Sequence, residues 1–223
     1  MSFILNIDTA IQTSSVCLSD NEQPLALRVN PSQKDGASWL HNAIIEVLKE
    51  NDLSVSQIDA VAVSAGPGSY TGLRVGMAAA KGLCYPLQKP LITINTLLMM
   101  AVTAIKEPVD LLSPMIDARR MEVFTAIYDK SLNKIIAESN CILNQDSFRD
   151  LLNKNKILFF GNGSAKFQPI INHQNALFKP ITITAESMPA LSSEKFNKQE
   201  FADLAYAEPF YGKDFYSTVK QSL

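Results

Sequence analysis

Residues 61–76 read Val-Ala-Val-Ser-Ala-Gly-Pro-Gly-Ser-Tyr-Thr-Gly-Leu-Arg-Val-Gly, a buried strand that enters a glycine turn and then a helix. The turn consists of Gly66, Pro67, Gly68, Ser69 and Gly72. Its glycines permit positive φ angles and close backbone approach, and Ser69 or Thr71 can cap the helix. Because a helix start can also bind an anion through free N–H groups, the residues leave a structural turn and a phosphate cradle equally open. No Lys-Ser/Thr pair follows, so the turn is not a Walker loop.

The helix after this turn is apolar on nearly every side. Between Leu73 and Cys84 the charged residues are Arg74 and Lys81, which lie seven residues apart and therefore on one stripe. A helix of this composition needs cover on most of its surface. We expect the cover to be the helix predicted at 37–50, a second protein chain, or both.

A partner interface is one interpretation of this helix, and packing inside the chain's own core is the other. The preceding helix contains Trp39, the single tryptophan, a residue type enriched among interface anchors, although it can equally pack within its own lobe. The predicted interface comprises Trp39, Leu40, His41, Tyr70, Thr71, Leu73, Arg74, Gly76, Met77, Ala79, Ala80 and Leu83.

The order of predicted elements starts again in the second half of the chain. Strands are expected at 2–8, 14–19, 24–30, 58–65 and 90–94, and helices at 37–50, 71–85 and 96–105. Residues 111–118 then resemble residues 3–10, because both are apolar strands that end in Ile-Asp. Residues 157–164 resemble residues 61–69, because both enter a Gly-x-Gly-Ser turn. Two landmarks in the same order indicate an internal duplication; an unduplicated α/β chain is the alternative.

A duplicated unit of this kind is typical of the α/β fold of actin, sugar kinases and the Hsp70 ATPase, which is ribonuclease H-like. We therefore predict two lobes with mixed sheets flanked by helices, an actin-like lobe at 1–106 and a reduced one at 107–223. The boundary is the proline-containing stretch 106–110.

In that fold a nucleotide lies between the lobes, which makes Asp8, Thr9, Asp117, Gly161 and Gly163 candidate cleft residues. Asp8 and Asp117 could hold a magnesium–nucleotide pair, or they could merely end their strands and accept turn N–H groups. We favour the second interpretation. No cofactor is then required, and weak binding of ATP or ADP stays open.

Composition argues for an ordinary soluble protein. Twenty Lys and Arg face 22 Asp and Glu, and since phosphate contacts supply much of nucleic-acid affinity, any role on RNA should depend on a partner. No apolar run reaches the roughly 18 residues of a membrane span, and the N-terminus lacks the basic flank of a secretory signal. We expect a cytoplasmic protein. Cys17, Cys84 and Cys141 are scattered, which favours small buried residues over disulfides or a metal site.

Residues 66–76 closely resemble the signature of the TsaB/YeaZ family. Weaker family segments match at 7–9, 39–41 and 116–123, in the same order, so that the resemblance spans roughly residues 1–165. Residues 212–214 depart from the family's usual Leu-Arg pattern, and no site is carried over there.

The resemblance implies a non-catalytic subunit that pairs with a larger paralogue, the threonylcarbamoyl transferase TsaD, and with a small ATPase, TsaE. Their complex makes threonylcarbamoyladenosine beside the anticodon of tRNAs that read codons beginning with A. Pairing would use the helices at 37–50 and 70–85, and the same surface would form a homodimer when the paralogue is absent. The tRNA would be reached only through the complex.

Two other classes of function stay open, a small-molecule kinase of the actin fold and a peptidase. The transferase paralogue holds its metal with a His-x-x-x-His pair, whereas His41 and His173 lie far apart in this sequence. That spacing excludes a metal site built on two histidines of one helix turn. No residue stands out as a general base, so we expect a scaffold rather than an enzyme.

Overall fold

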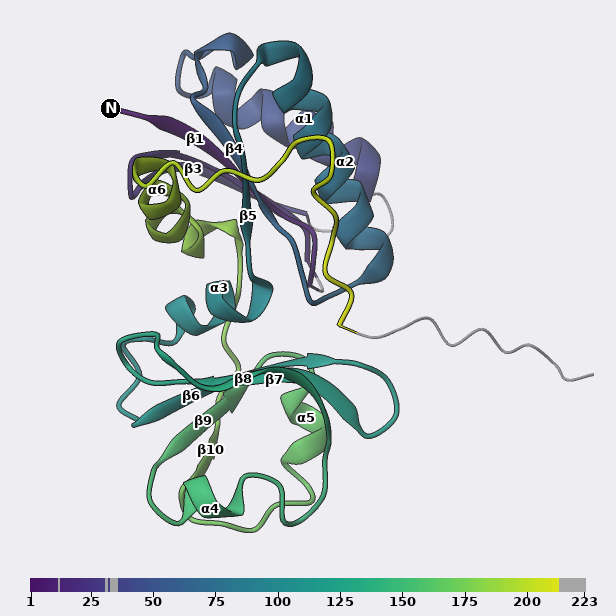
Figure 1. Cartoon of the computed structure of the whole chain (residues 1–223), viewed down its shortest axis with the longest axis vertical. Coiled ribbons are helices and arrows are strands. Elements are labelled where there is room, and N and C mark those ends of the chain that lie inside the picture. The colour runs from purple at the N-terminus through teal and green to yellow at the C-terminus, as the bar shows by residue number, and fades with distance from the viewer. Residues whose placement is uncertain (12, 31, 33–35, 213–223) are drawn as a thin grey trace, which may run out of the picture.

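The computed structural model describes residues 1–11, 13–30, 32 and 36–212, which form two five-stranded sheets, one above the other in Figure 1. The first sheet contains β1 (Phe3–Asp8), β2 (Ser15–Asp20), β3 (Gln23–Val29), β4 (Ala60–Ser64) and β5 (Leu91–Ile94). The second contains β6 (Leu111–Asp117), β7 (Glu122–Tyr128), β8 (Lys134–Ile142), β9 (Ile157–Phe160) and β10 (Ala176–Phe178).

The two sheets share one topology. The first has the order β3-β2-β1-β4-β5, and the second has the matching order β8-β7-β6-β9-β10. In each, the first three strands are antiparallel, and the fourth and fifth run parallel to the first. The predicted duplication of an actin-like unit with mixed sheets is therefore confirmed.

The helices are long in the first copy and short in the second. The first copy has α1 (Gly36–Lys49), α2 (Tyr70–Leu87) and α3 (Thr96–Thr103), and the second has α4 (Arg149–Leu152), α5 (Ser164–Phe167) and α6 (Pro189–Asn197). Single 3-10 turns lie at η1 (Val55–Gln57) and η2 (Ala185–Ser187). The helices that follow the third and fourth strands shrink from 14 and 18 residues to four each.

The alternation of side chains along β1 explains how the first sheet is covered. Leu5 and Ile7 face α1 and α2, whereas Ile4 faces α6 on the other side. The helix α6 is held there by a buried hydrogen bond of 2.7 Å from Ser192 Oγ to Asn6 Oδ1. Two helices from the first copy and one from the end of the chain thus enclose one sheet.

The helix α3 lies between the two lobes (Figure 1). Met99 packs on the α6 side of the first sheet, while Leu97 and Met100 pack on the second sheet beside Phe160. The described chain then leaves the second sheet and returns to the first from η2 onward. The division of the chain into two lobes after Lys106 stays a prediction. The chain crosses between the lobes twice, because residues from 185 onward pack against the first sheet.

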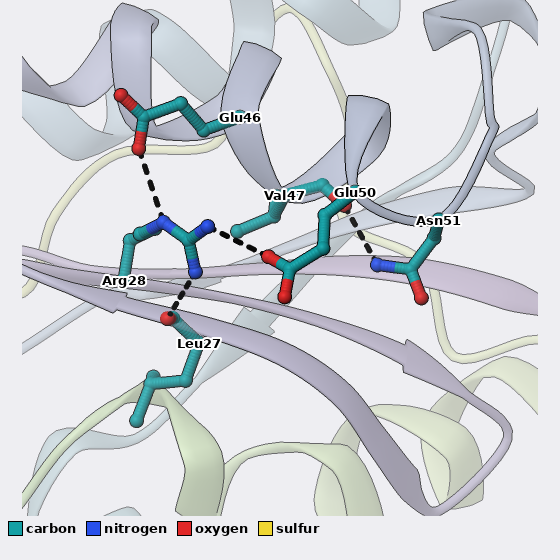
Figure 2. A network of polar contacts seen from close by, with 6 residues as sticks. All are labelled: Leu27, Arg28, Glu46, Val47, Glu50 and Asn51. Atoms are coloured by element: carbon teal, nitrogen blue, oxygen red, sulfur yellow. Dashed lines mark hydrogen bonds and ion pairs between the residues drawn. The ribbon is translucent and has the colours of Figure 1, made fainter.

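The helix α1 is fixed to the edge strand β3 by one arginine. Figure 2 shows the guanidinium of Arg28 between two carboxylates, that of Glu46 on α1 and that of Glu50 directly after it. Nε donates to Glu46 at 3.0 Å and a terminal nitrogen donates to Glu50 at 2.6 Å. A further nitrogen donates to the carbonyl of Leu27 at 3.0 Å. Because the two carboxylates are four residues apart at the end of α1, the outer face of that helix has a defined orientation.

Among the described residues, no helix has the length and apolar character that crossing a membrane requires. The three cysteines are free thiols; Cys17 and Cys84 are buried as predicted, and Cys141 is half-buried on β8.

Candidate protein-binding face and interlobe cleft

The glycine turn is filled by the chain's own backbone. A Cβ atom at Gly72 would lie 1.9 Å from the carbonyl oxygen of Thr9, and one at Gly68 would lie 2.3 Å from that of Ala10. On the other side of the turn, a Cβ atom at Gly66 (φ +113°) would lie 2.0 Å from the carbonyl oxygen of Phe210. These glycines are required because β1 and the chain's last described segment press against the turn.

The donors of the turn are also used internally. Ser69 N donates to Ala10 O at 2.6 Å, Gly72 N donates to Ser69 Oγ at 3.2 Å, and Gly66 N donates to Thr96 Oγ1 at 3.1 Å. The peptide bond between Gly66 and Pro67 is cis. Of the two interpretations that the sequence left open, the geometry supports a structural turn that joins β1, α2 and α3.

The two charged residues of the α2 stripe are hydrogen-bonded to a segment that the sequence did not indicate. Residues 201–212, here called the C-terminal strap, run from α6 across the first sheet and along α2 (Figure 1). Arg74 Nε donates to Tyr211 Oη at 3.0 Å, and its guanidinium lies 4.0 Å from the ring centroid of Tyr70. Lys81 Nζ donates to the carbonyl of Ala205 at 3.3 Å.

The flank of α2 next to this charged stripe is open to solvent. Thr71, Ala78, Gly82 and Tyr85 are exposed, and their spacing of seven, four and three residues places them on one face of the helix. An added Cβ at Gly82 would meet nothing within 4 Å. On α1 the exposed residues include His41, Asn42 and Ile45, whose side chain is 62% exposed. We call these seven residues the outer face of α1 and α2.

The predicted interface divides between this face and the core. Leu40, Leu73, Gly76, Met77 and Ala80 are buried within the chain, so a partner of the folded protein cannot reach them. Trp39, Ala79 and Leu83 are half-buried against the core, whereas His41, Tyr70, Thr71 and Arg74 are exposed. The interface prediction is therefore reduced to its surface members, and no observation on the chain alone tests it.

Asp8 is the first of the two predicted cleft aspartates, and it is fully buried at the end of β1. Its Oδ1 accepts hydrogen bonds from Ser64 Oγ at 2.6 Å and from Ala10 N at 3.0 Å. Its Oδ2 has no partner among the described residues. Burial raises the pKa of Asp8 to about 6, against the opposing effect of the hydrogen bonds from Ser64 and Ala10. Next to it, Thr9 Oγ1 donates to Gly72 O at 2.7 Å.

Asp117, the second cleft aspartate, is paired within its own lobe. Its Oδ1 accepts from Lys166 Nζ at 2.5 Å and from Arg119 N at 2.6 Å. Partial burial raises the pKa of Asp117, but the hydrogen bonds from Lys166 and Arg119 outweigh it and hold the pKa below its usual value. The glycines nearby serve packing, since a Cβ at Gly161 would meet Met115 O at 2.5 Å and one at Gly163 would meet Val123 at 2.8 Å.

A cleft of about 600 Å³ does lie between the lobes. Its walls come from Ile11 and Thr13 after β1, from Val29 on β3, from Met100 on α3, and from two later segments. These segments contribute Gly161, Asn162, Ser164, Ala165 and Gln168, and residues 178–184. Of the five predicted cleft residues, Gly161 is part of this wall. Within the described part of the chain, no group of three or more His, Cys, Asp and Glu side chains could hold a metal ion.

Comparison with known proteins places this chain among proteins of tRNA modification. A family model described as "TsaD: tRNA N6-adenosine threonylcarbamoyltransferase" matches residues 30–207. The "tRNA threonylcarbamoyladenosine biosynthesis protein TsaB" of Bacillus subtilis (strain 168) is 28% identical over 214 residues, which cover 93% of both chains. Its namesake in Escherichia coli (strain K12) is 26% identical over 216 residues, again 93% of each.

The chain belongs to the TsaB/YeaZ family. The solved structure "YeaZ from Pseudomonas aeruginosa" superimposes with a TM-score of 0.80 at 24% identity, covering 95% of this chain and 100% of the other. A second solved structure, of a protein described as similar to the peptidase YEAZ from the same organism, gives a TM-score of 0.85 over 96% and 100%. These structures confirm the predicted fold.

The family motifs predicted from the sequence lie before about residue 165, whereas the contacts missed by sequence reasoning involve residues after it. Tyr211 and Phe210 meet Arg74 and Gly66, which precede them by more than a hundred residues. The sequence signal for this segment was the run Pro209-Phe210-Tyr211. Such a run indicates a packed segment, but it does not identify the residues that the segment packs against.

Proposed function

We propose that this chain is a non-catalytic subunit of the machinery that makes threonylcarbamoyladenosine on tRNA, and that it binds the TsaD-type transferase through the outer face of α1 and α2. The process, tRNA modification, is inferred from the names of its relatives. The observation that carries the mode of action is the open stripe of Ala78 and Gly82 on α2, together with the exposed Ile45 on α1.

Small residues on a helix surface allow a second helix to approach closely, and an exposed isoleucine on the preceding helix can add apolar area to the contact. The glycine turn below α2 is rigid, because its glycines and donors are engaged by β1 and by the strap. The ion pairs of Arg28 fix α1 in the same way. The face is therefore pre-organised, which lowers the entropic cost of association.

The non-catalytic part of the proposal is supported by the state of the two aspartates. Asp8 is buried away from solvent, and Asp117 is neutralised by Lys166. Neither is arranged as a free carboxylate that could hold a nucleotide-bound cation. We also propose the finer points of the assembly: a TsaE-type ATPase as a further member, tRNA contact through the complex, homodimers of the isolated chain, and a cytoplasmic location.

The substitution Gly82→Arg tests the proposal. Arginine is a better helix former than glycine and meets no atom at this position, so the variant should fold. Its side chain would occupy the space that a docking helix needs. We expect binding of the transferase from the same source, measured by calorimetry, to weaken by about 100-fold or more, which is the loss of a central contact.

The matched control is Asn197→Arg, which places the same side chain at an exposed position of α6 on the other side of the first sheet. It should bind the transferase like the wild type. Wild-type affinity of the Gly82→Arg chain would refute the proposed docking face.

Nucleotide binding is the second candidate, because the interlobe cleft is large enough for a small ligand and Asp8 Oδ2 has no partner among the described residues. We propose that no cofactor is required and that any binding of ATP or ADP is weak. Calorimetry of the isolated chain with magnesium and millimolar nucleotide should give no heat; a saturable signal that disappears in Asp8→Asn would favour the kinase class instead.

A further inference from the structure

The C-terminal strap has an inner and an outer side. Ala202, Leu204 and Ala207 pack against the core beneath α2. The strap is tied down at both ends, since Ala202 N donates to Leu91 O at 2.8 Å and Phe210 N donates to Ala65 O at 2.7 Å. The exposed residues of the strap are Phe201, Asp203, Ala205, Tyr206, Glu208 and Phe210. Three of these are aromatic, two are acidic and none is basic.

The most exposed aromatic ring is held at the tip of an ordered turn. Asp203 Oδ1 accepts from the backbone N–H groups of Ala205 at 2.8 Å and Tyr206 at 3.1 Å, and Asp203 O accepts from Ala207 N at 2.8 Å. An aspartate that caps its own turn in this manner restricts the backbone. Tyr206 is 83% exposed at this fixed point.

Exposed aromatic side chains carry an energetic cost in water, and in structured positions they mark contact surfaces. Besides Tyr206, the ring of Phe210 is 54% exposed although its backbone is bonded to the glycine turn. Tyrosine and phenylalanine lose little conformational entropy on binding, which is why they are enriched in the centres of interfaces.

The strap is continuous with the outer face of α2. The hydrogen bond from Lys81 to Ala205 O places the Tyr206 turn against the last part of α2, and Tyr85, one helical turn beyond Lys81, is 79% exposed. At the other end of the strap, Tyr211 contacts Tyr70 with a ring-centroid distance of 4.9 Å. A partner protein that packs on Ala78 and Gly82 therefore reaches the strap by extending across the width of α2.

We propose that the C-terminal strap is a second contact for the transferase, in which Tyr206 and Phe210 enter apolar pockets bordered by basic side chains. The inference rests on the proposed function and deepens it by adding a second anchor to the docking face. The acidic residues Asp203 and Glu208 select a basic border, because opposite charges at an interface rim increase the association rate and exclude acidic surfaces.

The test is the double substitution Tyr206→Ala and Phe210→Ala in the full chain. Both rings are largely exposed, so the thermal midpoint should stay within a few degrees of the wild type. We expect the affinity for the transferase to fall by about 10- to 100-fold, as for the loss of aromatic anchors. The control is Ile142→Ala, which removes a side chain that is 67% exposed on β8 of the other sheet and should leave the affinity unchanged.

The outcomes separate this inference from the proposed function. If Gly82→Arg abolishes binding while the double variant binds like the wild type, the strap contact is refuted and the docking face stands. If Gly82→Arg itself binds normally, the proposed function fails. If the double variant changes self-association of the isolated chain but not transferase affinity, the strap belongs to a homodimer and the inference is overturned.

A charge reversal gives an independent readout. Glu208→Lys should slow association with the transferase by about threefold at low ionic strength, and the difference should shrink at high salt, as expected of a rim charge. Faster association of Glu208→Lys would mean that the facing surface is acidic and would contradict the proposed chemistry.

Discussion

Gly76 and Gly82 lie in the same helix, yet their surroundings are opposite. A Cβ at Gly76 would lie 2.2 Å from Thr9 Oγ1 beneath α2, whereas one at Gly82 would meet nothing within 4 Å. Alanine is a better helix former than glycine by about 1 kcal/mol. We predict that Gly82→Ala raises the free energy of unfolding by about 0.5–1 kcal/mol, while Gly76→Ala lowers it by about 1–3 kcal/mol through overpacking. Urea denaturation of both variants measures the two values.

The pair is its own control, because helix propensity changes equally at both positions and only the neighbours differ. Equal effects of the two substitutions would show that close packing of α2 on Thr9 does not contribute to stability.

Asp8 makes stability depend on pH in an unusual direction. Burial raises its pKa from 3.8 to about 6, so the folded state binds a proton that the unfolded state has released. The favourable contribution is complete below pH 3.8 and is lost as the pH rises through about 6. We predict that lowering the pH from 7.5 to 5 stabilises the wild type relative to Asp8→Asn by on the order of 1 kcal/mol.

Denaturation curves of both chains at pH 7.5, 6 and 5 test this prediction. A stability difference that is the same at all three pH values would mean that Asp8 titrates at its ordinary pKa despite its burial.

Single residues mark the limit of what the sequence could predict. The glycines at 66–76 indicated a turn with close backbone contacts, but the atoms that approach them belong to Thr9, Ala10 and Phe210. These neighbours are distant in sequence, and at Gly66, Gly68 and Gly72 the nearest atom is a backbone carbonyl oxygen, which carries no side-chain pattern. For the same reason, the sequence alone could not distinguish a structural turn from a phosphate cradle, and the three-dimensional contacts were required.

At the scale of elements, the contact between β3 and α1 rests on Arg28. Its two ion pairs share one guanidinium with Glu46 and Glu50, and its side chain is partly exposed. We predict that Arg28→Met lowers stability slightly, because ion pairs at a surface contribute little, and that Arg28→Lys lowers it less, because it keeps the charge but loses the forked geometry.

Thermal melting in low and high salt measures both effects. The cost of Arg28→Met should decrease in about 1 M NaCl, where charges at a surface are screened; a cost that does not respond to salt would assign the effect to packing of the arginine stem instead.

The elements of the first copy were predictable because each has a clear period. The alternation of β1 and the apolar spacing of α1 follow directly from the residues that the fold buries. The strap shows neither the alternation of a strand nor the spacing of a helix, since it is irregular backbone fixed by isolated hydrogen bonds. The sequence thus indicated that α2 needs cover but not that the end of the chain provides part of it.

At the scale of the molecule, the first lobe depends on the end of the chain. Without α6 and η2, the buried residues Ile4, Cys17, Ala60, Ala62 and Ile92 would form an uncovered apolar sheet face. We predict that a fragment of residues 1–106 does not fold stably and aggregates, since exposed apolar surface of this kind drives association. Circular dichroism melting and gel filtration report on both properties.

The matched control is the same fragment joined by a flexible linker to residues 183–212, which restores the cover and should recover a cooperative transition. A cooperative transition of fragment 1–106 alone would show that the predicted lobe at 1–106 is an autonomous unit after all.

The hydrogen bond between Arg74 and Tyr211 spans 137 positions of the chain. Since ribosomes synthesise the polypeptide from its N-terminus, α2 must wait until Tyr211 has been made before Arg74 gains this hydrogen bond. A product that terminates before Tyr211 would contain the residues of both sheets, but this flank of α2 would lack its contact with the strap. We therefore expect assembly with other proteins to be reserved for finished molecules, because a truncated one lacks part of the surface that surrounds this helix.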